Sequence, residues 1–485
     1  MNAPNVTTLF GLLSALLAGV MLAVLPADTA VIFLALAALL LLALMTPLAA
    51  LAVLLIIAPL RTLIATEASF QLPLDIGQLA LLLLLAVWAL YRIARRQTLL
   101  PFTASSVFVP PLLFLAAITP GAFFAASAGA WLNEWLKWVQ IILLVWLCLS
   151  CARAENWPWL IFCLAMAGLA NALIGLYQFF GGSGALHLLI DNRFFRAFGT
   201  FGQPNPFGAF MGLLAPLVLA AAWGYVLRFS ARWRRQHRFD QRLLLIALFY
   251  TACGVLIAVG VLISWSRGAW LGFAAAMLTV ILALPRRWWQ TLALLTGGTA
   301  LVLLLLLTGR VPAALLDRLS APEQYSILDD MRGVDITPEN YAVVERLAHW
   351  QAALNMARAH PLFGVGAGNY EVVYDNYRLL NWNFPLGHAH NYYLNIFAEA
   401  GIIGLATYLT LWLAVFWLTL RARRHPDSLA RAVAVGLLGT WTYLSVHSLT
   451  DNLYVNNLFL HIGVMLGLLA VLHHQTYRRI EIGTL

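Results

Sequence analysis

Charge is scarce in this sequence, and lysine is almost missing. Charged residues make up 10% of the 485 residues, and Lys137 is the single lysine. Soluble domains carry roughly 25% charged residues. The composition therefore excludes a soluble enzyme and a soluble nucleic-acid-binding protein, although the net charge is +9. We expect no nucleic-acid partner.

Two motifs that would bind a phosphate or a metal ion are also missing. No GxxxxGK(S/T) loop occurs, which argues against nucleotide hydrolysis. No DxD triplet occurs either, and a transferase that acts on sugar nucleotides usually needs such carboxylates to hold a metal ion on the diphosphate. We therefore expect neither a metal ion nor another cofactor.

Cysteine is rare as well. The chain has four cysteines, and all of them lie in or at the edges of apolar stretches, so no disulfide framework is expected. Cys148 and Cys151 form a single CxxC pair without a second pair or nearby histidines. This pattern indicates packing rather than metal binding.

Apolar residues dominate the rest of the chain. They make up 62% of it, and fourteen stretches approach or exceed the roughly 20 residues that a helix needs to cross a bilayer. The sequence therefore predicts an all-α polytopic membrane protein with about 12 to 14 transmembrane helices and one large helical loop on the outer side. The predicted spans are 7–25, 29–46, 47–65, 76–94, 106–125, 132–151, 157–180, 204–227, 243–265, 267–285, 290–308, 392–420, 430–450 and 455–473.

Basic residues indicate which face of the bundle is cytoplasmic. With both termini inside, the inner loops hold 18 of the 29 basic residues and only four acidic ones. This is the charge bias of cytoplasmic loops. Six of the arginines lie between Arg228 and Arg242, and we interpret them as a topology determinant. We expect a membrane protein with both termini cytoplasmic and a functional site on the outer side.

The longest outer loop, residues 309–391, divides the chain into three predicted parts. Residues 1–308 are expected to form an N-terminal transmembrane bundle that carries the arginine clusters. Residues 309–391 are expected to form an extracytoplasmic helical loop domain, and residues 392–485 the C-terminal transmembrane helices.

Within the long loop, the sequence predicts one amphipathic helix that lies along the outer surface. Thr337, followed by Pro338, is typical of a helix start. Apolar residues then recur at helical spacing as far as His360. The GxGxG run at residues 364–368 follows a helix rather than a strand, so it indicates a flexible turn and not a dinucleotide site.

The first of three polar clusters on the outer side precedes the span at 204–227. Arg193 and Arg196 lie shortly before Gln203 and Asn205, and Asn205 is expected to cap the helix with Pro206 as its first residue. Two guanidinium groups beside a helix N-terminus would bind an anion. The alternative is that these arginines reach out to lipid headgroups.

The second cluster is the tight turn Ser264-Trp265-Ser266-Arg267-Gly268 between two predicted spans. Its arginine lies at membrane level between two hydroxyl groups. A guanidinium in this position is expected to bind a phosphate through two hydrogen bonds, where a lysine would act only as a point charge. A lipid headgroup is the alternative partner.

The third cluster begins the span at 392–420 with His388, His390 and Asn391. On a continuous helix, Gly401 and Gly404 would lie on nearly the same face as the histidine, where they would let a neighbouring helix approach. Asn391, Asn395 and Glu399 form a second, polar stripe that descends into the membrane. Polar groups there are costly unless they line a cavity, which makes His390 a functional candidate.

Together the three clusters favour chemistry on a lipid-linked phosphate. Guanidinium groups suit a diphosphate, and an imidazole suits general-base work near neutral pH. A glycan carried on a polyprenyl diphosphate fits a site at the outer membrane surface. Arginines would stabilise the charge that develops on the departing diphosphate, as a metal ion does elsewhere.

Four segments of this sequence resemble motifs of the O-antigen ligase superfamily, which includes O-antigen ligases, O-antigen polymerases and bacterial protein O-oligosaccharyltransferases. The histidine motif matches His390-Asn391, nine residues, Gly401, two residues and Gly404. The other three are Arg196 to Asn205, with Gln203 where the family commonly has Asn, then Ser266-Arg267-Gly268, and His360 to Asn369.

The resemblance implies metal-independent transfer of a glycan from an undecaprenyl-diphosphate donor, with no cofactor. His390 would be the catalytic base, and Arg196, Arg267 and Arg193 would hold the diphosphate. Supporting roles would fall to Asn391, His388, Gln203 and Asn205.

The acceptor stays open between a lipid A core, a growing glycan and a protein hydroxyl. An O-antigen ligase is the first interpretation. A polymerase of O-antigen or exopolysaccharide, or a protein O-oligosaccharyltransferase, is the alternative within the superfamily. A lipid-linked glycan flippase is the alternative from another class. A flippase should show two related halves, and none are detected here.

Overall fold

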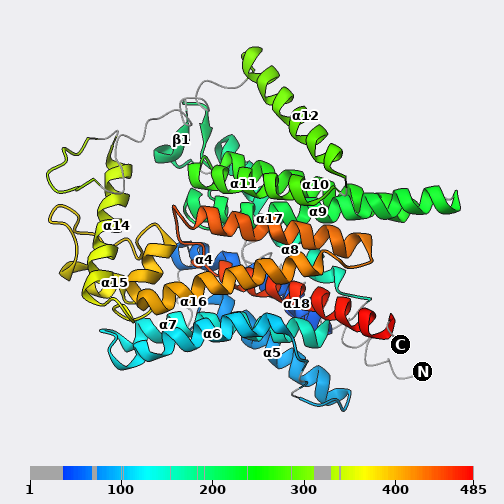
Figure 1. Cartoon of the computed structure of the whole chain (residues 1–485), viewed down its shortest axis with the longest axis horizontal. Helices are drawn as coiled ribbons and strands as arrows, with labels where there is room; N and C mark the ends of the chain where they lie inside the picture. The colour runs from blue at the N-terminus through cyan, green and yellow to red at the C-terminus, as the bar shows by residue number, and fades with distance from the viewer. Residues whose placement is uncertain are drawn as a thin grey trace, which may run out of the picture.

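The computed structural model is a bundle of long helices (Figure 1). It describes residues 37–67, 74–99, 101, 103–152, 155–182, 184–190, 192–237, 239–285, 287–310, 329–337 and 340–483. Within these ranges the only strands are β1 (Leu189–Ile190) and β2 (Phe194–Phe195), which pair antiparallel. The predicted all-α membrane fold is confirmed.

Eleven helical segments in the described ranges are long and apolar enough to cross a membrane, and the shorter α11 is also apolar. The predicted span 7–25 lies outside the described residues, as do residues 29–36 of the span 29–46. The helices are α3 (Pro47–Ile57), η1 (Ala58–Leu60), α4 (Arg61–Glu67), α5 (Ile76–Ala94), η2 (Ser106–Phe108), α6 (Val109–Ile118), η3 (Thr119–Phe123), α7 (Ala128–Cys151), α8 (Pro158–Tyr177), η4 (Gln178–Gly182), η5 (Leu186–Leu188), α9 (Pro204–Gln236), α10 (Gln241–Ile263), α11 (Arg267–Ala283), α12 (Trp288–Leu307), α14 (Tyr341–Ala359), α15 (Tyr370–Val373), η6 (Tyr374–Asn376), α16 (Tyr392–Ala422), α17 (Ser428–His447) and α18 (Leu458–Gly483).

Polar side chains fix several of the helix starts by accepting hydrogen bonds from free backbone N–H groups. Asp75 forms a capping box with Gln78 at the start of α5, and Ser127 caps α7. Asn391 caps α16 by accepting from the backbone N–H groups of Tyr393 and Leu394. Such caps place the polar loops at defined ends of apolar helices.

Two predicted helix starts are wrong by a few residues. Helix α9 begins at Pro204, with Gln203 as the preceding residue, so Asn205 lies inside the first turn and does not cap it. Proline has the backbone angle of a first helical residue, and here the first of the two prolines takes that position. Helix α14 begins at Tyr341 rather than after Thr337, because Asn340 precedes it and accepts a hydrogen bond from the Thr337 N–H.

One continuous apolar core holds the bundle together and joins helices from both ends of the sequence. Helix α9 packs closely against α17, where a side chain on Gly212 would overlap the ring of Tyr443. Small residues allow this approach between membrane helices. The predicted N-terminal and C-terminal membrane parts therefore share a single core.

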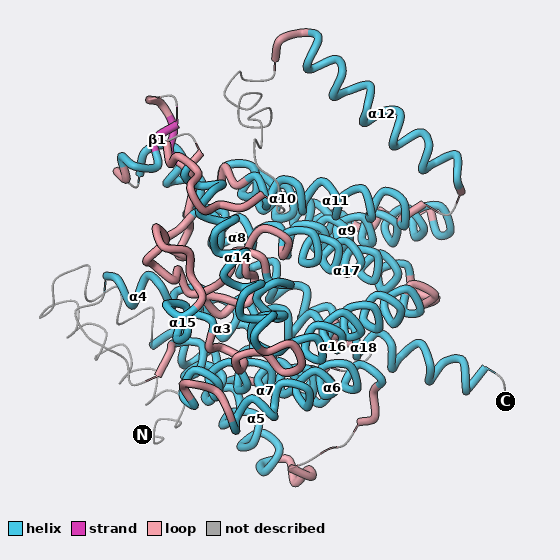
Figure 2. The backbone as a smooth tube through the Cα atoms, turned by 60° about the vertical axis from the view of Figure 1, so that its left-hand side comes forward, coloured by secondary structure: helices cyan, strands magenta, loops and turns pink. Residues whose placement is uncertain are grey.

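The segment 329–391 and the arginine-rich loops lie at opposite ends of the bundle. In Figure 1 helices α14 and α15 lie at the left, whereas α9 and α18 end at the right. Figure 2 shows α14 and its neighbouring loops crossing in front of the helix ends. The predicted helix is present as α14, and its buried residues include Val344, Leu347 and Ala348, but apolar side chains are not confined to one face of it.

Candidate active site

His390 occupies a constrained backbone position immediately before the α16 cap. Its φ is 52°, in the left-handed region that bulky side chains rarely adopt. The backbone around it is held on both sides. The N–H of Ala389 donates to the Asn395 side chain over 3.1 Å, and the N–H of Tyr392 donates to the Ser448 carbonyl over 2.8 Å. The imidazole is thereby directed by the fold rather than by a flexible loop.

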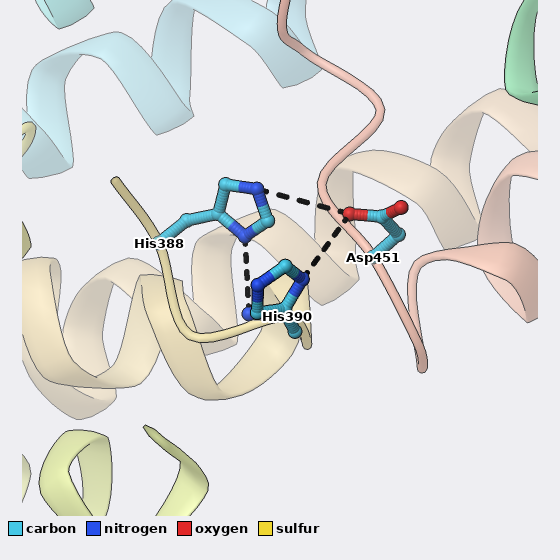
Figure 3. A group of neighbouring side chains, drawn as sticks. All are labelled: His388, His390 and Asp451. Atoms are coloured by element: carbon cyan, nitrogen blue, oxygen red, sulfur yellow. Dashed lines mark hydrogen bonds and ion pairs between the residues drawn. The ribbon is translucent and has the colours of Figure 1, made fainter. Parts of the chain in front are cut away.

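Asp451 faces two imidazoles from the turn between α17 and α18 (Figure 3). Its Oδ1 lies 3.7 Å from His390 Nδ1 and 3.7 Å from His388 Nε2. The same oxygen accepts a hydrogen bond from the Asn452 N–H over 2.8 Å. At this distance the carboxylate faces both rings without a hydrogen bond, and His390 Nδ1 is buried with no hydrogen-bond partner among the described residues. A positive charge on the His390 ring would be stabilised electrostatically by Asp451.

Hydrogen bonding determines which nitrogen of His388 carries the proton. The backbone N–H of His390 donates to His388 Nδ1 over 3.0 Å, so that nitrogen has no proton. In the neutral ring the proton is then on Nε2, which faces Asp451. For His390 the carboxylate faces Nδ1, and this favours the proton there. Figure 3 shows the other nitrogen of His390 turned away from Asp451.

Burial and neighbouring charges keep Asp451 ionised and His388 neutral. Burial alone would raise the pKa of Asp451, but His390, His388 and His447 outweigh it and hold the pKa well below its usual value. Burial, together with the neighbouring His390, Lys137 and Arg346, lowers the pKa of His388 to about 4, although the carboxylate of Asp451 opposes this shift. At neutral pH Asp451 and His388 together therefore carry one negative charge.

His388, His390 and Asp451 also place three ligand-type atoms within 4.8 Å of one another, which is a possible metal site. The hydrogen bond from the His390 N–H opposes this role. A metal-ligating histidine normally donates its other ring N–H to an acceptor. Nδ1 of His388 faces a donor instead, so Nε2 keeps its proton. The donor set therefore fits a metal ion poorly.

A cavity of about 940 Å³ opens beside the two histidines. Its wall brings together His388, His390, Gln203 and Asn205 from the predicted clusters. The predicted polar stripe of α16 contributes Asn395 and Glu399, so its place on a cavity is confirmed, while Asn391 is used as the cap. The remaining polar lining comes from Arg61, Thr62, Thr66, Asp75, Gln78, Asn133, Glu134, Lys137, Gln140, Glu371, Tyr392, Asp451, Asn452, Asn456 and Asn457.

The predicted arginines do not line this cavity. Arg196 donates from Nε to the Ser264 carbonyl over 3.2 Å, so the first two clusters meet at the turn between α10 and α11. Arg193 is exposed, and its guanidinium lies 5.0 Å from the ring centre of Phe194. Arg267 is the first residue of α11, next to Gly268, which packs against His447 and Thr450. The residues around Arg267 therefore lie next to the turn that carries Asp451.

Sequence reasoning missed two charged residues of the site. Asp451 lies between two spans as the only carboxylate of a short outer turn, and an acidic residue in that position was the available signal. Arg346 lies on α14, is partly buried, and acts electrostatically on both His388 and His447. Its position one turn from His349 on a predicted amphipathic helix gave no sign that it approaches the histidines.

The glycine turn at 364–368 packs against a break in α16, and it is not free on the surface. Gly401 has φ 63° and interrupts the helix, and its backbone closely approaches Leu362. The N–H of Val365 donates to Ala398, and the N–H of Ile402 donates to Pro361. The predicted continuous helix with a neighbouring helix at Gly401 and Gly404 is wrong here. The approaching backbone is the segment that follows α14.

Backbone strain is concentrated at this cavity. Four of the eight non-glycine residues with positive φ in the described chain line it: Leu386, His390, Asn456 and Asn457. Each such position costs of the order of 1–3 kcal/mol and persists only where surrounding contacts enforce it. Strain of this kind is typical of binding and catalytic sites.

Residues 252–409 match the family model described as O-antigen ligase. The match covers about a third of the chain, and this segment is similar to the O-antigen ligase family. The matched segment includes Arg267, Arg346 and His390, whereas Arg196 and Asp451 lie outside it. No curated protein matches the sequence. The match supports a membrane glycosyltransferase of the ligase and polymerase type, and the apolar helices indicate that the chain spans the membrane several times.

Proposed function

We propose that the protein transfers a glycan from an undecaprenyl-diphosphate donor to an acceptor hydroxyl at the periplasmic face of the bacterial cytoplasmic membrane. An O-antigen ligase is the form we favour, with both termini cytoplasmic. The observation that supports the proposal is His390, which faces the carboxylate of Asp451 at 3.7 Å and lines a cavity at the end of the bundle away from the arginine-rich loops.

In this reaction His390 acts as the general base. The acceptor oxygen attacks the anomeric carbon, its proton passes to His390 Nε2, and the bond from that carbon to the diphosphate oxygen breaks. Asp451 stabilises the imidazolium that forms, because its carboxylate faces Nδ1 at 3.7 Å. The undecaprenyl diphosphate leaves with the negative charge of the broken bond.

Arginine side chains bind the diphosphate close to the start of α11, next to the turn that carries Asp451. Arg196 is positioned by the Ser264 carbonyl, and Arg267 begins α11 nearby. Arg193 is the more exposed candidate of the three. We add Arg346, because its charge already acts on the histidines. Guanidinium groups bind diphosphate oxygens in pairs and stabilise developing negative charge.

The proposed reaction needs no metal ion. The hydrogen bond to His388 Nδ1 supports this, because it leaves Nε2 protonated toward Asp451. Charge on the leaving group is then neutralised by arginine side chains. Asn391, by contrast, supports the site indirectly, since its side-chain oxygen accepts the two backbone hydrogen bonds of the α16 cap.

The deciding experiment is a transfer assay in detergent or liposomes. Purified protein is given an undecaprenyl-diphosphate-linked oligosaccharide and a panel of acceptors, with His390→Ala alongside. We expect release of undecaprenyl diphosphate and lengthening of one acceptor by the wild type only. Movement of the lipid-linked sugar across liposomes without any transfer would instead establish the flippase alternative.

A further inference from the structure

The ring of His390 is not held in place by a hydrogen bond. Its Nδ1 is buried and has no hydrogen-bond partner in the described part of the chain, and the carboxylate oxygen that faces it, Asp451 Oδ1, lies 3.7 Å away. A general base must nevertheless keep one nitrogen directed at the proton that it takes up. The orientation of this ring therefore has to come from the side chains that pack around it.

Two other imidazoles pack against the His390 ring. The ring centre of His388 lies 4.4 Å away with the planes at 64°, and the ring centre of His349 lies 6.0 Å away with the planes at 79°. Both are edge-to-face arrangements, which aromatic pairs favour. His388 belongs to the same loop as His390 (Figure 3), whereas His349 belongs to α14. His349 is therefore the contact that a separate helix provides.

The ring of His349 is itself fixed by two tyrosines. The residue is 1% exposed, and its Nδ1 lies 2.9 Å from the Tyr370 hydroxyl. That hydroxyl donates its single hydrogen to the His349 carbonyl over 3.2 Å, so its oxygen accepts the Nδ1–H. Tyr374 stacks on the ring, with the centres 4.9 Å apart and the planes at 17°. The hydrogen bond and the stacking contact thus fix both the position and the plane of the His349 ring.

The two tyrosines belong to the same small core as the loop of His390. Ala389, which precedes His390, is buried in one apolar cluster with Tyr370 and Tyr374. Residues of α14, α15 and α16 make up this cluster, so it joins the helix that carries His349 to the helix that follows His390. The distance between the two histidine rings is therefore set by close packing within one unit.

His349 is also neutral, as a side chain beside a base should be. Burial, together with His390 and His388, lowers the pKa of His349 to about 3. When His390 takes up a proton, its ring becomes positively charged. A second positive charge at this distance would oppose that step, whereas a neutral ring does not.

We propose that His349 is a positioning residue for the base, and that its ring holds the His390 imidazole with Nδ1 toward Asp451 and Nε2 toward the cavity. The inference rests on the proposed function and adds a residue that lies outside the four sequence motifs. His349 acts through His390 and does not contact the substrate. Its loss should therefore change the rate of the reaction and leave substrate binding unchanged.

His349→Leu and His349→Phe separate the ring contact from simple filling of space. Leucine has no ring, so kcat should fall about three- to tenfold, in the range that one aromatic pair contributes, while the KM values stay near wild type. Phenylalanine restores a ring and should keep kcat near wild type. Trp382→Leu is the control, because it removes a buried ring that packs on Tyr341 at the start of α14. It should lower the melting temperature without lowering kcat.

Chemical modification tests the contact without any transfer reaction. Diethyl pyrocarbonate reacts with unprotonated imidazole nitrogens, and tandem mass spectrometry distinguishes His388 from His390 in one peptide. His390 should react faster in His349→Leu than in the wild type, because its ring is then free to turn and to expose Nδ1. The rate at His390 should stay at the wild-type value in His349→Phe and Trp382→Leu.

The outcomes separate this inference from the proposed function. An unchanged modification rate at His390 in His349→Leu would overturn the positioning role. So would a wild-type kcat in that variant, a raised KM with an unchanged kcat, or an equal loss of kcat in His349→Phe. Each of these results leaves the proposed function intact as long as the wild type transfers a glycan. If the wild type transfers none, the proposed function fails, and the modification rates still decide whether His349 fixes the His390 ring.

Discussion

His390 Nδ1 lies 3.7 Å from Asp451 Oδ1, although 61 positions separate the two residues in the sequence. The histidine precedes α16 and the aspartate follows α17, and the backbone hydrogen bond from Tyr392 to Ser448 ties the two segments together. The candidate base and the carboxylate that faces it are therefore brought together by the packing of two membrane helices.

Asp451→Asn should lower kcat about 10²–10⁴-fold, the range that general acid–base catalysis contributes. The amide keeps the shape of the side chain but does not stabilise an imidazolium. KM values for donor and acceptor should change little, since the carboxylate is expected to act through His390. Steady-state transfer kinetics measure this, and a thermal melting curve checks folding. Wild-type kcat in this variant would remove Asp451 from the mechanism.

Arg346→Gln and Arg267→Lys should each lower kcat/KM for the donor roughly 10- to 100-fold, because hydrogen bonds to charged groups contribute about 1.5–3 kcal/mol. Lysine keeps the charge of Arg267 but loses the paired geometry. Arg358→Gln is the matched control, since this arginine is exposed near the end of α14. Equal effects in Arg346→Gln and Arg358→Gln would show that Arg346 acts only through general surface charge.

Transfer should survive removal of divalent cations. EDTA at millimolar concentration is expected to leave the initial rate unchanged, because the tautomer of His388 opposes metal binding and arginines neutralise the leaving group. The rate is measured before and after chelation, with a metal-dependent glycosyltransferase treated in parallel. A loss of activity that added Mg²⁺ or Zn²⁺ restores would contradict the metal-independent mechanism.

Acid should destabilise the region of α14. Burial, together with the neighbouring His390 and His388, lowers the pKa of His349 to about 3, whereas the unfolded value is about 6.5. Between these values the unfolded chain binds more protons, so the free energy of unfolding falls as the pH falls from about 6.5 toward 3. The slope is at most about 1.4 kcal/mol per pH unit for this group.

Melting temperatures between pH 7.5 and pH 4.5 measure this slope. His349→Phe should flatten it, because phenylalanine cannot take up a proton and the hydrogen bond from the Tyr370 hydroxyl to the residue 349 carbonyl remains possible. His388 contributes in the same direction, so some slope persists. If the melting temperature changed equally with pH in the wild type and in the variant, His349 would not be held neutral in the folded protein.

Gly401→Ala should destabilise the protein by about 2 kcal/mol or more. The residue has φ 63°, which costs an alanine roughly 1–2 kcal/mol, and a Cβ atom would lie 2.3 Å from the Leu362 carbonyl. Gly297→Ala is the control, because a Cβ atom meets nothing within 4 Å there. Chemical unfolding of both variants gives the comparison, and equal stability would contradict the tight packing of the break.

Sequence alone located the spans and the histidine because both depend on local signals. Apolar runs predict α5 as 76–94, where the structure has Ile76–Ala94. His390 stands out as an ionisable residue at the edge of an apolar run. The break at Gly401 was missed, since it depends on the approach of a segment some 40 residues earlier, and helical periodicity assumes an unbroken axis.

The partners of the histidine were also missed for a physical reason. Asp451 reaches His390 only because α16 and α17 pack side by side, and the chain gives no local sign of that pairing. Arg346 faces the histidines through the orientation of α14.

The left-handed residues around the cavity affect how stability is distributed in the protein. Leu386, His390, Asn456 and Asn457 hold costly backbone angles, while the apolar core elsewhere is closely packed. The strained backbone around the cavity is therefore expected to open before the closely packed bundle, which serves as its frame. In the proposed reaction a bound substrate would add contacts at this place and so protect the protein against unfolding there.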